Sequence, residues 1–109
     1  MMRIAKEGWP LILSAAAMAL LALLFGWQAV GLVLAVLTAG VAAFFRDPER
    51  VAPVGEGLVV APADGKVVII APVHGDTLFA DAVTRISIFL SPLDVHINRA
   101  PVAGRVDEV

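Results

Sequence analysis

The sequence contains no cysteine among its 109 residues, which excludes disulfide bonds, thiolate metal sites and a cysteine nucleophile. Its only histidines, His74 and His96, are 22 residues apart and lack the helical spacing of a metal-binding pair. No glycine-rich phosphate loop follows a strand and opens a helix. A basic patch with interleaved aromatic residues is also missing. We therefore expect no bound metal and no nucleic-acid partner.

Charged residues are absent from the 38 residues 8–45, and the excess of hydrophobic residues, which make up 60% of the chain, is concentrated there. One helix of that length would measure about 57 Å, whereas the hydrocarbon core of a bilayer is about 30 Å thick. The run is interrupted at Gly26, Trp27 and Gln28. We predict two apolar helices, residues 9–25 and 29–45, that form a transmembrane or re-entrant hairpin.

Basic residues flank both ends of this uncharged run, with Arg3 and Lys6 before it and Arg46 and Arg50 after it. A hairpin places both pairs on one side of the membrane, and the positive-inside rule makes that side cytoplasmic. We therefore expect the cell (inner) membrane, with the remainder of the chain on its cytoplasmic face. The competing interpretation is a secretory signal peptide, whose apolar core has about 7–15 residues. The small residues at 14–19 suit a cleavage site, but more apolar sequence follows them.

The rest of the chain has an ordinary composition and predicts a mainly antiparallel β domain that is incomplete in this chain. In the charged segment after the apolar run, Pro48 is expected to stop the second helix. A β-hairpin is predicted from two short β-rich runs that flank a turn. The expected elements are a hairpin at 58–71 with its turn at 62–65, a second turn at 72–76, and strands at 85–90 and 102–109.

These elements define an α+β fold class with three units. Residues 1–45 form a membrane-anchoring helical hairpin, residues 46–57 an interfacial linker, and residues 58–109 a partial β-rich catalytic domain. About 64 residues after the anchor are few for an independent hydrophobic core.

The densest group of reactive side chains comprises Asp94, His96, Asn98 and Arg99. The first three alternate with apolar residues, so a strand would place them on one face. Histidine exchanges protons near neutral pH, and either Asp64 or Asp94 is a candidate to orient its ring. A lone histidine on a polar strand face is nevertheless more often a surface residue, and aspartate is common in turns such as the one at Asp64. Residue types alone therefore support only a possible Asp–His acid/base pair.

Three segments carry longer patterns in a fixed order. They are Phe-Phe-Arg-Asp-Pro-Glu-Arg at 44–50, Ala-Pro-Ala-Asp-Gly-Lys-Val at 61–67, and Phe-Leu-Ser-Pro-Leu-Asp-Val-His-Ile-Asn-Arg-Ala-Pro at 89–101. Together they resemble the short, bacterial and archaeal type of phosphatidylserine decarboxylase proenzyme, from the anchor to the last residue. A membrane anchor agrees with an enzyme whose substrate is a bilayer lipid.

The resemblance implies a lyase that converts phosphatidylserine to phosphatidylethanolamine with a pyruvoyl cofactor. In this family a serine in a Gly-Ser motif attacks the preceding carbonyl, the chain splits into β and α subunits, and the serine becomes the pyruvoyl group. That group forms a Schiff base with the substrate amine and stabilises the carbanion left after loss of CO₂. The implied partners are the phospholipid bilayer, phosphatidylserine and the α subunit produced by self-cleavage, and a homo-oligomer is compatible with them.

The resemblance also assigns roles to residues. The family's motif aspartate falls on Asp64 and its motif histidine on His96, which are the implied catalytic residues. His96 would protonate the intermediate or position the carboxylate, and Asp64 would support the histidine that activates the serine. Arg46, Asn98 and Arg99 are the candidate substrate-binding residues.

The chain departs from the family pattern in two respects. Long-form members have a second histidine at the position of Arg99, so either His96 serves both steps or self-processing depends on another group. No Gly-Ser dipeptide occurs, because the only serines are Ser14, Ser87 and Ser91. The precursor of the pyruvoyl group is therefore absent. We expect this sequence to correspond to the front part of the β subunit and to be inactive by itself.

A second interpretation comes from the segment at 61–67, which also resembles the turn of lipoyl- or biotinyl-type β-sandwiches and of sugar-phosphotransferase carrier domains. The chain would then be a membrane-tethered carrier or binding module, with His96 as a phosphate acceptor or with no catalytic residue. This interpretation does not explain the segments at 44–50 and 89–101.

Overall fold

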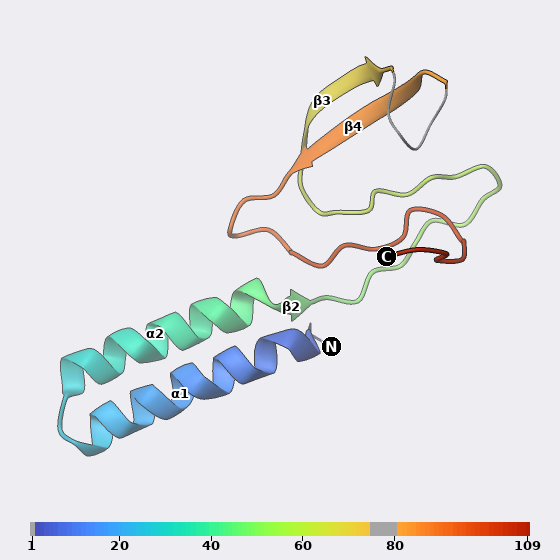
Figure 1. The fold of residues 1–109 in the computed structure, drawn as a ribbon. Helices are drawn as coiled ribbons and strands as arrows, with labels where there is room; N and C mark the ends of the chain where they lie inside the picture. The colour runs from blue at the N-terminus through green and yellow to red at the C-terminus, as the bar shows by residue number, and fades with distance from the viewer. Residues whose placement is uncertain (1, 75–80) are drawn as a thin grey trace.

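The computed structural model describes residues 2–74 and 81–109. It consists of a helical hairpin joined by irregular segments to a two-stranded antiparallel sheet (Figure 1). This arrangement confirms the expected α+β class. The elements in chain order are β1 (Arg3–Ile4), the 3-10 helix η1 (Lys6–Gly8), α1 (Trp9–Leu24), α2 (Gln28–Phe44), β2 (Arg46–Asp47), β3 (Lys66–Val73) and β4 (Val83–Phe89).

The two helices were predicted to within one residue at each end. Each helix is apolar also on the surface that does not contact the other helix. Leu13, Leu20 and Leu32 are examples of exposed apolar residues on these surfaces. A helix that is hydrophobic all round is suited to burial in a large core or a membrane. With its 3-10 start, the first helix runs over Lys6–Leu24, 19 residues, and is long and apolar enough to cross a bilayer, whereas α2 has 17 residues.

The turn between the helices depends on Gly26. The N–H of Trp27 donates to the carbonyl of Ala22 at 2.8 Å, and the N–H of Gly26 donates to that of Leu23 at 3.1 Å. These two bonds form a Schellman motif, which ends α1. Gly26 has a φ of 78°, in the left-handed region that costs other residues about 1–2 kcal/mol. The predicted break at 26–28 is confirmed.

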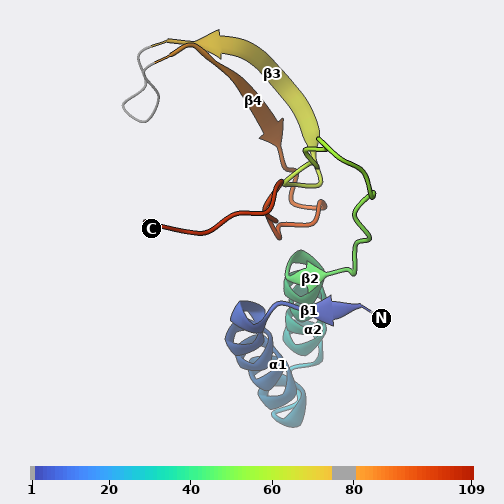
Figure 2. The same ribbon diagram turned by 90° about the vertical axis from the view of Figure 1, so that its right-hand side faces the viewer.

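The open end of the hairpin is closed by a short antiparallel pair (Figure 2). Arg3 lies opposite Asp47 and Ile4 opposite Arg46, so the N-terminal residues pair with the segment that follows α2. α2 ends at Phe44, one residue before its predicted end and ahead of Pro48, beyond which no helix was expected. Arg46 and Asp47 pair with β1, so the chain leaves the helical conformation before it reaches the proline.

Gly8 provides a test of the packing at this end of the hairpin. An alanine Cβ at Gly8 would lie 2.5 Å from the Cβ of Phe45, and neither atom can rotate away. Overpacking of this kind costs about 1–3 kcal/mol, so Gly8→Ala is expected to lower the stability of the chain in detergent micelles. Denaturant unfolding followed by circular dichroism would measure the change.

Gly40→Ala is the matched control, since its new Cβ would meet nothing within 4 Å. Alanine is the better helix former, so this variant should be stabilised by up to about 1 kcal/mol. Equal stability of Gly8→Ala and the unchanged chain would contradict the close contact with Phe45.

The sheet pairs β3 with β4, from Lys66 opposite Phe89 to Val73 opposite Val83, with an irregularity between Val67 and Ile69. The predicted hairpin at 58–71 is therefore wrong. Residues 58–61 form no strand, and the N–H of Val60 donates instead to the carbonyl of Pro101 at 3.1 Å. β4 is more distant in the sequence, but its seven residues offer β3 more pairing positions than the four residues 58–61 would. The turn predicted at 62–65 is present as a bend, which leads into β3.

Three other expectations concern the loops and the last strand. The turn at 72–76 is wrong for Pro72 and Val73, which end β3, and residues 75–76 lie outside the described residues. The strand at 85–90 is confirmed as β4, which begins two residues earlier. The strand at 102–109 is wrong, because this exposed, charge-rich segment has no strand neighbour in the described part of the chain and its backbone is left to water.

Few side chains are buried among the described residues. Ile12, Ala19 and Ala22 belong to α1, and Val95 lies in the segment after β4. Within residues 2–74 and 81–109, nothing buries the side chains of the sheet to a similar degree. Ile69 and Ile70, whose side chains point to opposite faces of β3, are 43% and 69% exposed. Both faces of this strand are thus apolar and open.

Candidate active site

The three segments that carry the long sequence patterns meet at the junction between the hairpin and the sheet. Arg99 makes most of the connections. Its backbone N–H donates to the carbonyl of Pro62 at 2.8 Å. Its Nη2 donates to Oδ1 of Asp47 at 2.6 Å and to the carbonyl of Pro48 at 2.9 Å. One residue therefore joins the segment after β4 to both of the other segments.

A pocket of about 260 Å³ lies at this meeting point and is lined by residues of all three segments, including Arg50, Asp64 and Arg99. Arg50 and Asp64 also form an ion pair with each other. Their side chains are 51% and 40% exposed. An exposed pair of this kind contributes about 0.2–1 kcal/mol, so its main effect is to orient the two side chains.

The imidazole of His96 is half-buried and held from two sides. Its Nδ1 lies 2.9 Å from the main-chain oxygen of Asp94. A carbonyl oxygen only accepts hydrogen bonds, so this contact places the proton on Nδ1 and leaves Nε2 as the acceptor of the neutral ring. The ring also stacks on Phe44, at a centroid distance of 4.1 Å and an interplanar angle of 23°. Nε2 is therefore the atom suited to exchange a proton with a bound molecule.

The predicted strand that would place Asp94, His96 and Asn98 on one face is wrong, because residues 91–98 form a turn and an irregular segment. The carboxylate of Asp94 accepts from the N–H of Ser91 at 2.8 Å, and the N–H of Asp94 donates to the carbonyl of Ser91 at 3.0 Å. Aspartate commonly closes turns in this way. We call residues 91–101 the histidine loop.

Neither of the two candidate carboxylates, Asp64 and Asp94, contacts the His96 ring in the described part of the chain. The described contacts of Asp64 join it to Arg50, and those of the Asp94 carboxylate join it to Ser91. The contact of His96 with Asp94 is made by the main-chain oxygen.

The candidate substrate-binding residues occupy different positions around the histidine loop. Arg46 donates through Nη1 to the carbonyl of Ala43 at 2.8 Å and through Nη2 to the carbonyl of Leu93. It therefore ties the end of α2 to the histidine loop. Asn98 is exposed on that loop. Both side-chain contacts of Arg99 with described residues use Nη2.

Sequence reasoning missed Phe44 as a partner of His96. The residue was interpreted only as part of the second apolar helix, and no local signal reveals a contact across 52 positions. Its place at the start of the segment 44–50 was the one available hint.

Phe44→Leu is expected to shift the NMR signals of the His96 ring. Protons above the face of an aromatic ring are shielded, and leucine removes that shielding while keeping an apolar side chain. Selective labelling of histidine would give two sets of signals in the chain, and the exposed His74, next to the end of β3, provides the internal control. Unchanged signals from His96 would contradict the stacking on Phe44.

Comparison with known proteins identifies relatives of this chain. The family described as phosphatidylserine decarboxylase matches residues 37–109. A phosphatidylserine decarboxylase proenzyme of Symbiobacterium thermophilum is 52% identical over 103 residues, which cover 94% of this chain and 47% of that protein. The proteins of the same name from Syntrophotalea carbinolica and Anaplasma phagocytophilum are 43% identical, over 94% and 93% of this chain and 48% and 44% of their own lengths.

The chain spans about half the length of these curated relatives. No solved structure matches it. The matched region contains all three of the segments that meet at Arg99 and the pocket beside Asp64.

Proposed function

This chain belongs to the phosphatidylserine decarboxylase family, and from that membership we propose that it forms part of an enzyme that converts phosphatidylserine to phosphatidylethanolamine. The observation that supports the proposal best is the convergence of the segments 44–50, 61–67 and 89–101 at Arg99 and the pocket beside Asp64, with the half-buried His96 of the third segment stacked on Phe44 of the first. A carrier module would need only the segment 61–67, so the family match over all three favours the enzyme.

His96 is proposed to move the proton that decarboxylation requires. Loss of CO₂ leaves the substrate carbon in need of a proton. The contact of Nδ1 with Asp94 leaves Nε2 as the free nitrogen, which would first take up a proton and then deliver it to that carbon. The stacking on Phe44 limits rotation of the ring, so Nε2 keeps one direction. The same nitrogen would serve as the base during self-cleavage if no other group does.

The proposed cofactor is a pyruvoyl group, which supplies an electron sink for decarboxylation. The serines of this chain do not fit its precursor, since none follows a glycine. Ser14 lies within α1 and donates to the carbonyl of Pro10, and Ser91 belongs to the turn of the histidine loop. We infer that the required serine belongs to the part of the family sequence that this chain does not match.

Asp64 is proposed to support self-cleavage from the edge of the pocket, where its pair with Arg50 fixes the direction of the carboxylate. Arg46, Asn98 and Arg99 are proposed to bind the lipid headgroup. A guanidinium presents a planar set of donors that suits phosphate and carboxylate oxygens. Arg99 lines the same pocket as Asp64.

The hairpin is proposed as the membrane anchor, with residues 46–57 at the interface and residues 58–109 as the cytoplasmic catalytic part. Helices of 16 and 17 residues are about 24–26 Å long, slightly short of the hydrocarbon core of about 30 Å. They therefore suit a thin or locally thinned bilayer, or a re-entrant loop. Both ends of the hairpin lie together and carry basic residues, which favours the cytoplasmic side of the inner membrane.

The proposed protein partner is the α subunit that self-cleavage would produce. A strand that is apolar on both faces is normally covered on both. Val68 and Ile70 of β3 and Ile86 of β4 are each more than half exposed, and nothing in the described part of the chain covers them. A second copy of this chain is the alternative occupant.

A chimera tests the proposal. It joins this chain, after Val109, to the part of the Symbiobacterium thermophilum relative that lies beyond the aligned region. In nanodiscs containing phosphatidylserine, the chimera should split in two, carry a pyruvoyl-blocked amino terminus on the smaller product, and form phosphatidylethanolamine. The 109-residue chain alone should form none. A folded chimera that splits and yet leaves phosphatidylserine unchanged would overturn the proposed reaction.

A further inference from the structure

We propose that the tip of the histidine loop, Pro92 and Leu93, inserts into the surface of the bilayer that holds the helical hairpin. The partner is the phospholipid layer itself, contacted through an apolar side chain. The inference rests on the membrane anchoring proposed above and adds to it a second point of contact, in the part of the chain that carries His96.

Leu93 projects from the protein into solvent. Its exposed fraction is 83%, and the neighbouring Pro92 is exposed as well. Val95, two residues further on, is only 5% exposed, so the loop is held to the protein by one apolar residue while it presents another. A single exposed leucine is ordinary on a protein surface. Its position relative to the proposed membrane helices therefore decides what it contacts.

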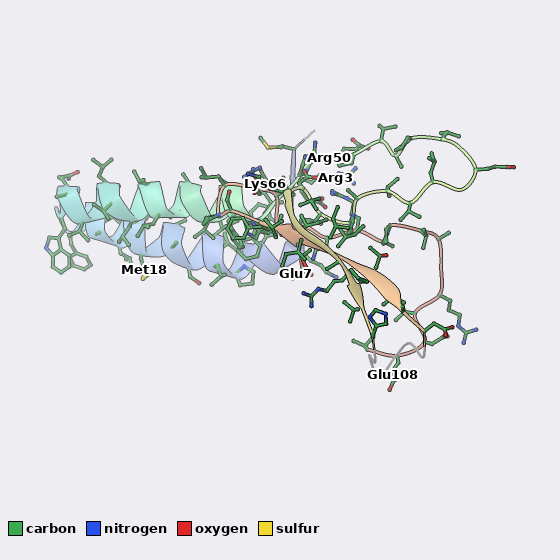
Figure 3. The ribbon with its side chains drawn as sticks, turned by 90° about the horizontal axis from the view of Figure 1, so that it is seen from above. Arg3, Glu7, Met18, Arg50, Lys66 and Glu108 are labelled. Carbon is green, nitrogen blue, oxygen red and sulfur yellow. The ribbon has the colours of Figure 1, made fainter. Side chains whose placement is uncertain are left out.

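The tip of the loop lies beside the last turn of α2. The guanidinium of Arg46 donates through Nη1 to the carbonyl of Ala43, in that turn, and through Nη2 to the carbonyl of Leu93. One side chain thus holds both main chains, which places Leu93 close to the level of the helix end. The segment after β4 reaches back over the end of α2 (Figure 1). Figure 3 shows this end of the hairpin at the labelled Arg3, with Met18 further along the helices.

The backbone of the tip is already hydrogen-bonded, which suits it to an apolar layer. The N–H of Ser91 donates to the carboxylate of Asp94 at 2.8 Å, and the N–H of Asp94 donates to the carbonyl of Ser91 at 3.0 Å. The N–H of Leu93 donates to Oγ of Ser91 at 3.3 Å, and Pro92 has no N–H. Each N–H of residues 91–94 therefore has a partner within the protein. Leaving water is costly for polar groups that are unpaired, and these are paired.

The charge of Asp94 sets how deep the tip can go. Its carboxylate is half-buried in the turn, directly after Leu93. A carboxylate is costly to bring into hydrocarbon, so insertion should stop at the boundary between the headgroups and the acyl chains. At that depth the loop would hold His96, three residues after Leu93, beside the layer in which the headgroup of the substrate lies.

The bilayer is favoured as the occupant because the element next to the tip would itself be surrounded by lipid. Val36 and Leu37 of α2 are exposed, so the apolar surface of this helix continues toward the end that Leu93 adjoins. The α subunit and a second copy of this chain are the alternative occupants, and the experiment below distinguishes them.

Single-cysteine variants test the contact, because the chain contains no cysteine of its own. The 109-residue chain with Leu93→Cys is placed in phosphatidylcholine nanodiscs, loaded so that each disc holds a single chain. Its reaction with a membrane-impermeant maleimide is followed by mass spectrometry. Apolar surroundings raise the pKa of a thiol and so lower the fraction of reactive thiolate. We expect Leu93→Cys to react about tenfold more slowly than a cysteine in water, which corresponds to a pKa about one above the usual value.

Two variants provide the reference rates. Thr84→Cys places the thiol on an exposed position of β4, opposite Pro72 and away from the hairpin, and should react at the full rate. Leu20→Cys places it on the exposed surface of α1 and should not react while the disc is intact.

A further pair tests the side chain of Leu93 itself. A cysteine at the neighbouring tip position, Pro92→Cys, should be protected in the same way as Leu93→Cys. Adding Leu93→Asn, which has a similar size and a polar side chain, should raise the rate of Pro92→Cys toward that of Thr84→Cys. An unchanged rate would contradict insertion through the leucine.

The outcomes separate this proposal from the proposed function, since the labelling requires no catalysis. If Leu20→Cys reacts as fast as Thr84→Cys, the membrane anchor fails and the loop contact fails with it. If Leu20→Cys is protected and Leu93→Cys is not, the loop contact alone is overturned. Protection of Leu93→Cys that then appears only in the chimera would assign the tip to the α subunit, and protection only in discs with two chains would assign it to a second copy.

Discussion

Replacing His96 with alanine in the chimera is expected to reduce phosphatidylethanolamine formation by a factor of about 10²–10⁴, the usual contribution of a general acid or base. The imidazole is the group that the structure fixes with Nε2 available, through its contact with Asp94 and its stacking on Phe44. Alanine removes the proton donor and leaves the loop backbone unchanged. Conversion of labelled phosphatidylserine in nanodiscs would measure the loss.

His74→Ala is the matched control, because it makes the same substitution at an exposed position near the sheet end and should leave the rate unchanged. The extent of chain cleavage must be measured in the same samples. A His96→Ala chimera that remains unsplit would place the histidine in self-cleavage, and one that splits but does not decarboxylate would place it in turnover. Normal phosphatidylethanolamine formation would exclude His96 from both steps.

Asp64→Asn in the chimera is expected to slow self-cleavage on the order of 10²-fold, so that the unsplit chain accumulates. The substitution keeps the shape of the side chain and removes the negative charge that would support an activating histidine. A time course of translation, with the products separated by gel electrophoresis, would measure the fraction of split chain. Because cleavage precedes formation of the cofactor, the loss should appear before any assay of lipid conversion.

Arg50→Gln separates two explanations for slower cleavage in Asp64→Asn: loss of the carboxylate itself, or loss of its ion pair with Arg50. It breaks the same ion pair but leaves the carboxylate of Asp64 in the pocket. Since an exposed pair contributes about 0.2–1 kcal/mol, we expect only a few-fold change in the cleavage rate. Equal losses in the two variants would show that Asp64 acts by holding its loop through Arg50, which would contradict a direct role for the carboxylate.

The helical hairpin was predictable because its determinants are local. An uncharged run, a break at Gly26 and flanking basic residues are all visible in the sequence, and the helix ends followed to within one residue. The sheet was harder to predict because strand partners are chosen over long distances. The short run at 58–61 is adjacent to β3 in sequence, and yet β3 pairs with β4 because that strand offers more paired positions.

The candidate site was likewise predictable in its local features and unpredictable in its long-range contacts. Its residues were named from the sequence, because the segments containing Asp64, His96 and Arg99 stand out by their patterns. Their contacts were not predictable. Alternation around His96 indicated a strand, whereas the bonds between Ser91 and Asp94 close a turn that alternation cannot reveal. The aromatic partner of His96 comes from the end of α2, and only the folded chain brings it there.

The stacking of His96 on Phe44 has a mechanical consequence. Phe44 is the last residue of α2, so the ring that would handle protons rests directly on the tip of a proposed membrane helix. Helices respond to bilayer thickness by tilting, at a cost of fractions of a kcal/mol per Å of mismatch. A change in the tilt of α2 would displace Phe44 and, with it, the direction of Nε2. In this arrangement, the acyl-chain length of the surrounding lipids becomes a determinant of the geometry at the histidine.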